Sequence, residues 1–357
     1  MNRMQQYIDE QPQILSALVS RRSAVAAPVV ARLRDADLRR LILFGSGSSY
    51  HAAVMAAPIL SRALGIEATA CVPTRLSDLA GLDPQGTAYI AISQGGRSTN
   101  TYDLIGALQA QGIPAVAVTE SNDTPVAQRA DCAVDLPIGP EDIGAKTKGV
   151  SATAVTLMLI GLELGRARGT ADAAWYAEII AGLTRLADGM AENIARSKAW
   201  CELVCPALAP AQYLTVLAKG PARGGALEGA LKLLETIYRP VTPYEFEEYL
   251  HGVQNALDGA GSFLCIQPLD EDGARMRRLV DFVESHGVRC FVVTEEAAAA
   301  RGAQDLVLQS PGCPMLQSLT VLPALQTLSA QLSAHCGIDT TKRRYPDFFA
   351  MMASKLE

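Results

Sequence analysis

The sequence predicts an α/β protein with two tandem copies of one parallel, doubly wound sheet flanked by helices. Three observations predict it. Short apolar runs alternate with helical patterns, which is typical of parallel sheets. Glycine- and serine-rich turns follow two of these runs, and the second half of the chain repeats the order of the first. The 357 residues also exceed the roughly 250–300 that one core serves, so two domains are expected.

The first copy follows a helical arm predicted at residues 1–34, with four apolar positions facing inward. Its strands are predicted at 41–44, 68–72 and 89–92 and in the runs IPAVAVTES and ADCAVDLPI. A helix is expected from 98 to 111, with its apolar residues on one face. A run of helices from about 151 to 200 then follows this half of the chain.

The second copy is visible as an echo of the first. LTVLAKGPARGGALEGALKL follows LILFGSGSSYHAAVMAAPIL at an offset of 173, which aligns Gly47 with Gly220. GSFLCIQP follows TAYIAISQ at 174, and VRCFVVTEE follows IPAVAVTES at 175. So gradual a drift implies a duplicated domain. We expect a first domain at 35–170, linking helices at 171–200, a second domain at 201–340 and a tail at 341–357.

Composition and charge restrict the function classes. The net charge of −6, with the only basic run longer than two at Lys342–Arg344, argues against a nucleic-acid or membrane partner. The polar N-terminus shows no signal peptide, and the apolar run Val150–Leu162 is too short to span a bilayer, so it is expected to be a core helix. The eight scattered cysteines read as buried thiols of a reducing compartment. Together these features predict a cytoplasmic protein.

Two loops of the first copy are candidates for binding phosphate. GSGSSY follows the strand at 41–44, and SQGGRST follows the strand at 89–92. Free backbone N–H groups at a helix start, together with several hydroxyls, can donate to phosphate oxygens. The dinucleotide pattern G-x-G-x-x-G does not fit, because Tyr50 occupies its third position. For either loop alone a helix cap with ordinary turn serines is an alternative. Two such loops on neighbouring strands favour phosphate.

The stretch from 224 to 251 carries the candidate acid/base groups. Its first half reads as a helix, in which a leucine stripe is expected to face a core. Glu228, Lys232 and Glu235 form the adjoining stripe, and His251 follows after two prolines. These groups can exchange protons at neutral pH. The alternative is a solvated Glu–Lys pair, which stabilises a helix by roughly 0.2–0.5 kcal/mol. The leucines concerned are Leu227, Leu231 and Leu234.

The two copies differ where chemistry would occur. The second replaces SQGGRST with QPLDEDG, whose carboxylates would repel phosphate, and it has Glu228 where the first has Met55. We therefore expect one half to bind an anion and the other to supply acid/base groups. Cys201 and Cys205 have no second pair at metal-binding spacing, so no metal site is expected.

These motifs resemble the double sugar isomerase (SIS) domain family. The resemblance is closest to the isomerase half of glucosamine-6-phosphate synthase and to related ketosamine-6-phosphate deglycases and aminosugar-6-phosphate deaminases. It covers nearly the whole chain and implies two tandem SIS domains with flavodoxin-like sheets. The motifs that carry it are YIDEQPQ, GSGSSYHA, ISQGGRST, EDIGAKTK and, most specifically, ALEGALKLLETIY followed by His251.

The resemblance implies a role for each matching residue. Glu235 would move a proton between C1 and C2 of a sugar through an enediol or enaminol, and Glu228 and Lys232 would assist. His251 would open the sugar ring in the site of the neighbouring subunit, so a homodimer is implied. No metal or organic cofactor is implied. The 6-phosphate and sugar would be bound by Gly47, Ser48, Ser49, Ser93, Gln94, Gly95, Gly96 and Ser98 and by the backbone of Gly144, Ala145 and Lys146.

Three departures from the family pattern bear on the reaction. No glutaminase half with an N-terminal cysteine is present in these residues, so glutamine is not expected to be the nitrogen donor. Met351 aligns with the synthase's Schiff-base lysine, and Lys355 comes four residues later. Gly95 and Arg97 replace a serine and an acidic residue of the phosphate loop. These departures favour removal of an amine from a sugar phosphate by a deglycase or deaminase. The alternatives are aldose–ketose isomerisation or ammonia-dependent amination, and a non-catalytic sugar-phosphate sensor.

Overall fold

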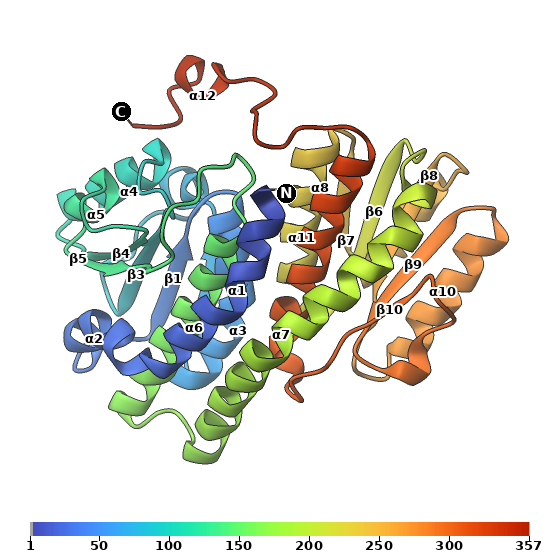
Figure 1. Ribbon diagram of the computed structural model, residues 1–357. Coiled ribbons are helices and arrows are strands. Elements are labelled where there is room, and N and C mark those ends of the chain that lie inside the picture. Colours follow the sequence, from blue (N-terminus) through green and yellow to red (C-terminus); the bar gives the residue numbers. More distant parts are fainter. Residues whose placement is uncertain (1–2, 357) are drawn as a thin grey trace. The chain divides into compact units, whose positions relative to one another are not determined.

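The strands of the chain form two separate five-stranded sheets in which every neighbouring pair is parallel. The computed structural model describes residues 3–356 (Figure 1). The first sheet has the order β2-β1-β3-β4-β5 and the second has β7-β6-β8-β9-β10. Both are the 2-1-3-4-5 order of flavodoxin-like sheets, whose order reverses between the first and third strands. The predicted fold class, with its duplication, is confirmed.

The described residues divide into two compact units. The first-sheet unit comprises residues 13–142, 148–184 and 343–356, and the second-sheet unit comprises residues 3–12, 143–147 and 185–342. Residues 1 and 2 of the predicted arm and residue 357 of the predicted tail lie outside the described residues.

The first sheet consists of short, mostly buried strands. Leu41 and Leu43 point to one face and Ile42 and Phe44 to the other, where α4 and α5 pack. The strands are β1 (Arg40–Phe44), β2 (Glu67–Cys71), β3 (Thr87–Ile92), β4 (Ala115–Thr119) and β5 (Cys132–Asp135). The helices are α1 (Arg3–Ser20), α2 (Arg22–Leu33), α3 (Ser48–Leu64), η1 (Arg75–Ala80), α4 (Thr99–Ala110), α5 (Pro125–Arg129) and α6 (Lys148–Arg168).

Helix α6 is the core helix expected from the apolar run Val150–Leu162. It packs against α3 at two glycines, because a Cβ on Gly161 would lie 2.6 Å from Leu60 Cγ and one on Gly165 would lie 2.3 Å from the Ala63 carbonyl oxygen. Within residues 3–356 it is the one helix that is long and apolar enough by itself to cross a membrane, and 89% of the window concerned is buried. Helices α1 and α2 pass that test only as a pair bent by 55°.

The second sheet is covered on both faces. One face packs on α7, α8 and α11, and the other on α9 and α10 (Figure 1). Its strands are β6 (Tyr213–Ala218), β7 (Val241–Glu245), β8 (Gly261–Ile266), β9 (Arg289–Thr294) and β10 (Leu306–Val307). The helices are α7 (Ala173–Leu208), η2 (Gly220–Ala222), α8 (Arg223–Ile237), α9 (Phe246–Tyr249), η3 (Val253–Ala256), α10 (Gly273–Ser285), η4 (Ala297–Ala299), η5 (Pro314–Leu316), α11 (Gln317–His335) and, in the tail, α12 (Phe348–Met351).

The backbone confirms the alignment of the two copies. Gly47 after β1 has a φ of +57°, and Gly220 after β6 has a φ of +55°. Strand β7 was not predicted, because Pro240 and Pro243 were read as breaks. Pro243 is tolerated because β7 is an edge strand, where a missing backbone N–H need not cost a ladder hydrogen bond.

Candidate functional site

The order of the first sheet reverses between β1 and β3, and ligands of open α/β sheets bind at the carboxyl ends of the strands at such a point. Both predicted phosphate loops begin there. Gly47 ends the first loop with a positive φ and open space around its Cα, a conformation that favours glycine. Ser48 and Ser49 follow, half-buried, in the first turn of α3.

A polar network links the two loops. Asn100 Nδ2 donates to Ser46 Oγ at 2.9 Å, and Ser98 Oγ donates to Asn100 Oδ1 at 2.7 Å. Ser46 and Asn100 are exposed and Ser98 is half-buried, so the network is accessible from outside. Asn100 and Ser46 were not among the predicted site residues. The available signal was an amide among the hydroxyls that open α4.

The second loop makes a tight turn after β3. Gly96 N donates to the Ser93 carbonyl oxygen at 2.8 Å, and Gly96 has a φ of +59°. A Cβ at this position would lie 2.1 Å from Thr124, so glycine is required for both reasons. Ser93 and Gln94 are buried, whereas Gly95 is half-buried.

Glu141 braces this loop from behind. Its carboxylate accepts hydrogen bonds from Gln94 Nε2 at 2.7 Å and from the backbone N–H groups of Lys148 and Gly149 at 2.9 and 3.4 Å. Lys148 and Gly149 begin α6, where a negative charge is stabilised by the helix dipole. A Cβ on Gly149 would lie 2.1 Å from Gln94 Cδ. Glu141 therefore fixes Gln94 against the start of α6, a role the sequence reasoning missed.

The C-terminal tail also pairs with the second loop. Leu356 N donates to the Arg97 carbonyl oxygen at 2.8 Å, and Thr99 Oγ1 donates to the Ala353 carbonyl oxygen at 2.9 Å. Ser98 and Lys355 form an antiparallel bridge. Residues 353–356 thus run along the edge of the predicted phosphate loop, a contact between distant segments that no local pattern indicates. Lys355 itself is exposed.

In the second-sheet unit, the predicted acid/base residues lie together on α8. The side chains of Glu228 and Lys232 are 0% and 1% exposed, and that of Glu235 is 33% exposed. Lys232 Nζ lies 3.3 Å from Glu228 Oε1 and 2.5 Å from Glu235 Oε2. A solvated surface pair is therefore excluded for Glu228 and Lys232. Burial acts to lower the pKa of Lys232, but the two carboxylates outweigh it and raise the pKa, so the ammonium stays charged.

The predicted leucine stripe of α8 was wrong. Leu227 and Leu231 are half-buried and Leu234 is 43% exposed. Close approach of α11 explains the difference, because a Cβ on Gly225 would lie 2.6 Å from the Ser318 carbonyl oxygen and one on Gly229 would lie 2.3 Å from Leu325. Small residues on this side turn the leucine stripe outward. The core face consists instead of Ala226, Ala230, Leu233 and Ile237.

The remaining predicted residues of this unit lie in turns. His251 follows α9 and is exposed. In the part of the chain that the structure describes, its ring makes no hydrogen bond or ion pair with the α8 residues. The segment 143–147 belongs to this unit. Within it, Gly144 is exposed, Lys146 is half-buried, and the carbonyl of buried Ala145 accepts a hydrogen bond from Thr147 Oγ1 at 2.8 Å.

The reversal point of the second sheet, between β6 and β8, is occupied by its own ion pairs. Lys219 Nζ lies 3.1 Å from Asp270 Oδ2 and also bonds Asp272. Arg275 bonds Asp272 at 2.9 Å and pairs with Glu247. Hydrogen bonds from Lys219 and then Arg275 lower the pKa of Asp272. Among residues 3–356, no group of three His, Cys, Asp or Glu side chains is placed to hold a metal ion.

Comparison with known proteins supplies the family. Residues 33–162 match the model of the SIS domain. The chain is 24% identical over 348 residues to a glutamine–fructose-6-phosphate aminotransferase (isomerizing) of Caulobacter vibrioides, covering 96% of this chain and 57% of the relative. It thus spans little more than half the length of that relative.

Solved structures share the whole fold. A Clostridium difficile protein assigned provisionally as a phosphosugar isomerase is 26% identical with a TM-score of 0.88, covering 100% of this chain and 99% of that one. The C-terminal domain of the Francisella tularensis glucosamine-fructose-6-phosphate aminotransferase is 18% identical with a TM-score of 0.85, covering 95% and 97%. Residues 33–162 therefore form a SIS domain, and the chain is a homologue of the isomerase part of the glutamine–fructose-6-phosphate aminotransferases.

Proposed function

We propose that the chain is a phosphosugar isomerase-type enzyme that removes the amine from an amine-bearing hexose 6-phosphate, as a deglycase or deaminase. The observation that carries the proposal is the α8 stripe, in which buried Lys232 is held between buried Glu228 and accessible Glu235. An ion triplet of this kind is costly to bury unless it is used, so it indicates a reaction site more than a structural one.

In the proposed reaction, the hydroxyls and backbone N–H groups after β1 and β3 would hold the 6-phosphate. Glu235 would take a proton from one carbon of the C1–C2 bond and return it to the other through an enaminol. The carbon bearing the amine then becomes an imine carbon, water adds to it, and the amine leaves with a proton. Lys232 would keep Glu235 ionised for this step. A positioned base contributes roughly 10²–10⁴-fold to such a proton transfer.

The comparisons support the substrate class. The names of the relatives specify fructose 6-phosphate, and the shared region is the one the chain covers almost completely. The direction of the reaction rests on the departures at Met351 and Lys355. Met351 is 71% exposed, and its thioether cannot form the imine that a lysine at this place would form.

The test is release of free amine from defined substrates. The protein is incubated separately with fructosamine 6-phosphates, glucosamine 6-phosphate and fructose 6-phosphate. Amine release from one of the first two is expected, and Glu235→Gln should abolish it. Leu234→Gln, on the neighbouring exposed position, serves as the matched control and should retain activity. Interconversion of fructose and glucose 6-phosphates alone would indicate an isomerase, and tight binding without turnover would indicate a sensor.

We further propose that His251 acts in the site of a second copy of the chain. Its exposed position and lack of ring contacts with α8 support this. Glu235→Gln and His251→Asn variants, each inactive alone, should then recover part of the activity when mixed, because one hybrid site carries both native residues. Absence of any recovery, under conditions in which the two variants exchange subunits, would contradict a shared site.

A further inference from the structure

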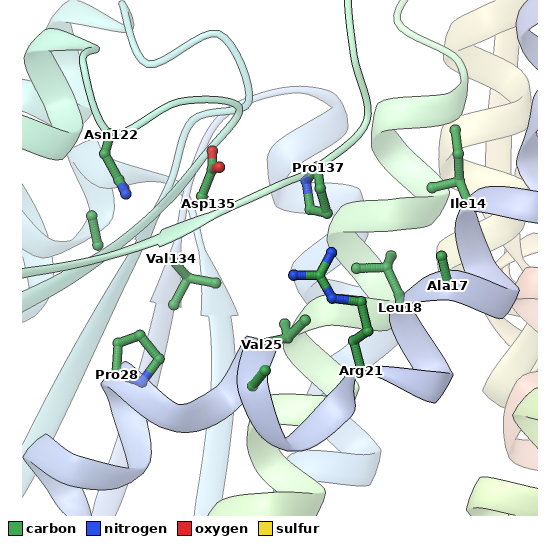
Figure 2. A pocket seen from close by; sticks show the side chains of 12 residues that line it. Ile14, Ala17, Leu18, Arg21, Val25, Pro28, Asn122, Val134, Asp135 and Pro137 are labelled. Carbon is green, nitrogen blue, oxygen red and sulfur yellow. The ribbon is translucent and has the colours of Figure 1, made fainter.

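A cavity of about 290 Å³ lies between the corner of α1 and α2 and the edge strand β5 (Figure 2). It is made entirely by residues of the first-sheet unit. Its apolar wall includes buried Leu18 and Val134 and half-buried Val25. The volume is close to the lower limit of small-molecule pockets. Because β5 is two strands away from β3 in the sheet order, this cavity is separate from the reversal point that carries the phosphate loops.

Three polar side chains surround the apolar wall. Figure 2 shows the Arg21 guanidinium reaching from the α1–α2 corner towards Val134, with the Asp135 carboxylate and the Asn122 amide on the strand side. All three are exposed and therefore accessible. Within residues 3–356, no side-chain hydrogen bond or ion pair is made by any of them, and Arg21 and Asp135 are not within ion-pair distance of each other.

The lack of internal pairing distinguishes Arg21 from its neighbours. Arg22, the next residue, donates to Tyr176 Oη at 3.2 Å and pairs with Glu163 at 3.5 Å. At the opposite side of the cavity, burial and then the nearby Asp123 carboxylate raise the pKa of Asp135. A positive group beside Asp135 would relieve that repulsion, and no described side chain provides one.

We propose that this cavity binds a free α-amino acid with an apolar side chain. The Arg21 guanidinium matches a carboxylate, Asp135 matches an ammonium, and the wall formed by Leu18, Val25 and Val134 matches an aliphatic side chain. A ligand with only one sign of charge would meet repulsion from Asp135 or from Arg21. The proposal does not depend on the reaction proposed above.

The test is calorimetric titration of the full chain with three probes of the same carbon skeleton. Leucine carries both charges, 4-methylpentanoate only the carboxylate, and isopentylamine only the ammonium. Leucine should bind at one site per chain, and each analogue should bind roughly tenfold more weakly or worse because it loses one charged contact. No heat from leucine at concentrations up to about 10 mM, or equal binding of all three probes, would overturn the proposal.

Two variants test the assignment of the charges. Arg21→Gln should remove the preference for leucine over isopentylamine, and Asp135→Asn should remove the preference for leucine over 4-methylpentanoate. Arg34→Gln is the matched control, because Arg34 is exposed near the end of the same arm and pairs only with Asp35. It should leave leucine binding unchanged. Melting curves of the three variants establish that each is folded, and retention of full leucine binding by a folded Arg21→Gln would overturn the assignment.

Discussion

Replacing Lys232 by methionine tests whether the buried stripe of α8 is ionised. Methionine keeps most of the volume of the lysine side chain and removes its charge. The variant leaves the Glu228 carboxylate, which is 0% exposed, without its ammonium partner at 3.3 Å. Glu235 loses the same partner but is 33% exposed and remains partly hydrated. The penalty should therefore arise mainly at Glu228.

The magnitude has an upper limit. Breaking a buried ion pair by removing one partner costs about 3–5 kcal/mol. The carboxyl can escape part of this by taking up a proton, and neutralising a carboxyl of ordinary pKa at pH 7 costs about 3.7 kcal/mol. We therefore expect Lys232→Met to lower the free energy of unfolding by about 3–4 kcal/mol at pH 7. At pH 5 neutralisation costs only about 1 kcal/mol, so the loss should shrink accordingly.

Urea denaturation at pH 7 and pH 5 measures both values. The double variant Glu228→Gln/Lys232→Met should recover most of the lost stability, because it removes the carboxylate that the single variant leaves unpaired. The reasoning is refuted if Lys232→Met unfolds within about 1 kcal/mol of the native chain at pH 7, or if its loss is the same at both pH values.

Three further predictions concern individual residues. Leu233→Ala, at a buried position, should cost about 2–5 kcal/mol, whereas Leu234→Ala on the exposed stripe should cost below about 1 kcal/mol; equal losses in urea denaturation would contradict the orientation of α8. Burial acts to raise the pKa of Glu163, but its hydrogen-bond donors outweigh burial and hold it below 4.5, so its stabilisation exists above pH 4.5 and is lost as the pH falls through the folded-state pKa. Glu163→Gln should therefore be less stable than the native chain at pH 7, and melting curves should converge below pH 4.5. Gly47→Ala should cost about 1–3 kcal/mol because φ is +57°, while Gly95→Ala, with no positive φ and Glu120 Oε1 3.8 Å from its Cβ, should unfold at nearly the native urea concentration.

The sequence reasoning succeeded where local pattern and tertiary structure coincide. The buried strands β1, β3, β4 and β8 are continuous apolar runs bounded by turns, as central parallel strands must be. The duplication was visible because Gly47 and Gly220 perform the same backbone turn in both copies.

It failed where the neighbour of an element decides its orientation. Helix periodicity placed Glu228, Lys232 and Glu235 on one stripe, but it could not say that the adjoining glycine and alanine face, not the leucine face, would meet α11. The contacts of Glu141 with Gln94 and of the tail with residues 97–99 join segments more than 40 residues apart. No local pattern contains such information.

The ion pairs of Lys219 with Asp270 and Asp272 have a consequence for stoichiometry. The second crevice of the duplicated fold already holds negative charge from its own chain, so an incoming oxyanion would have to compete with tethered carboxylates. Titration with a phosphate ester should consequently reach equivalence at one ligand per polypeptide, although the architecture offers the same crevice twice.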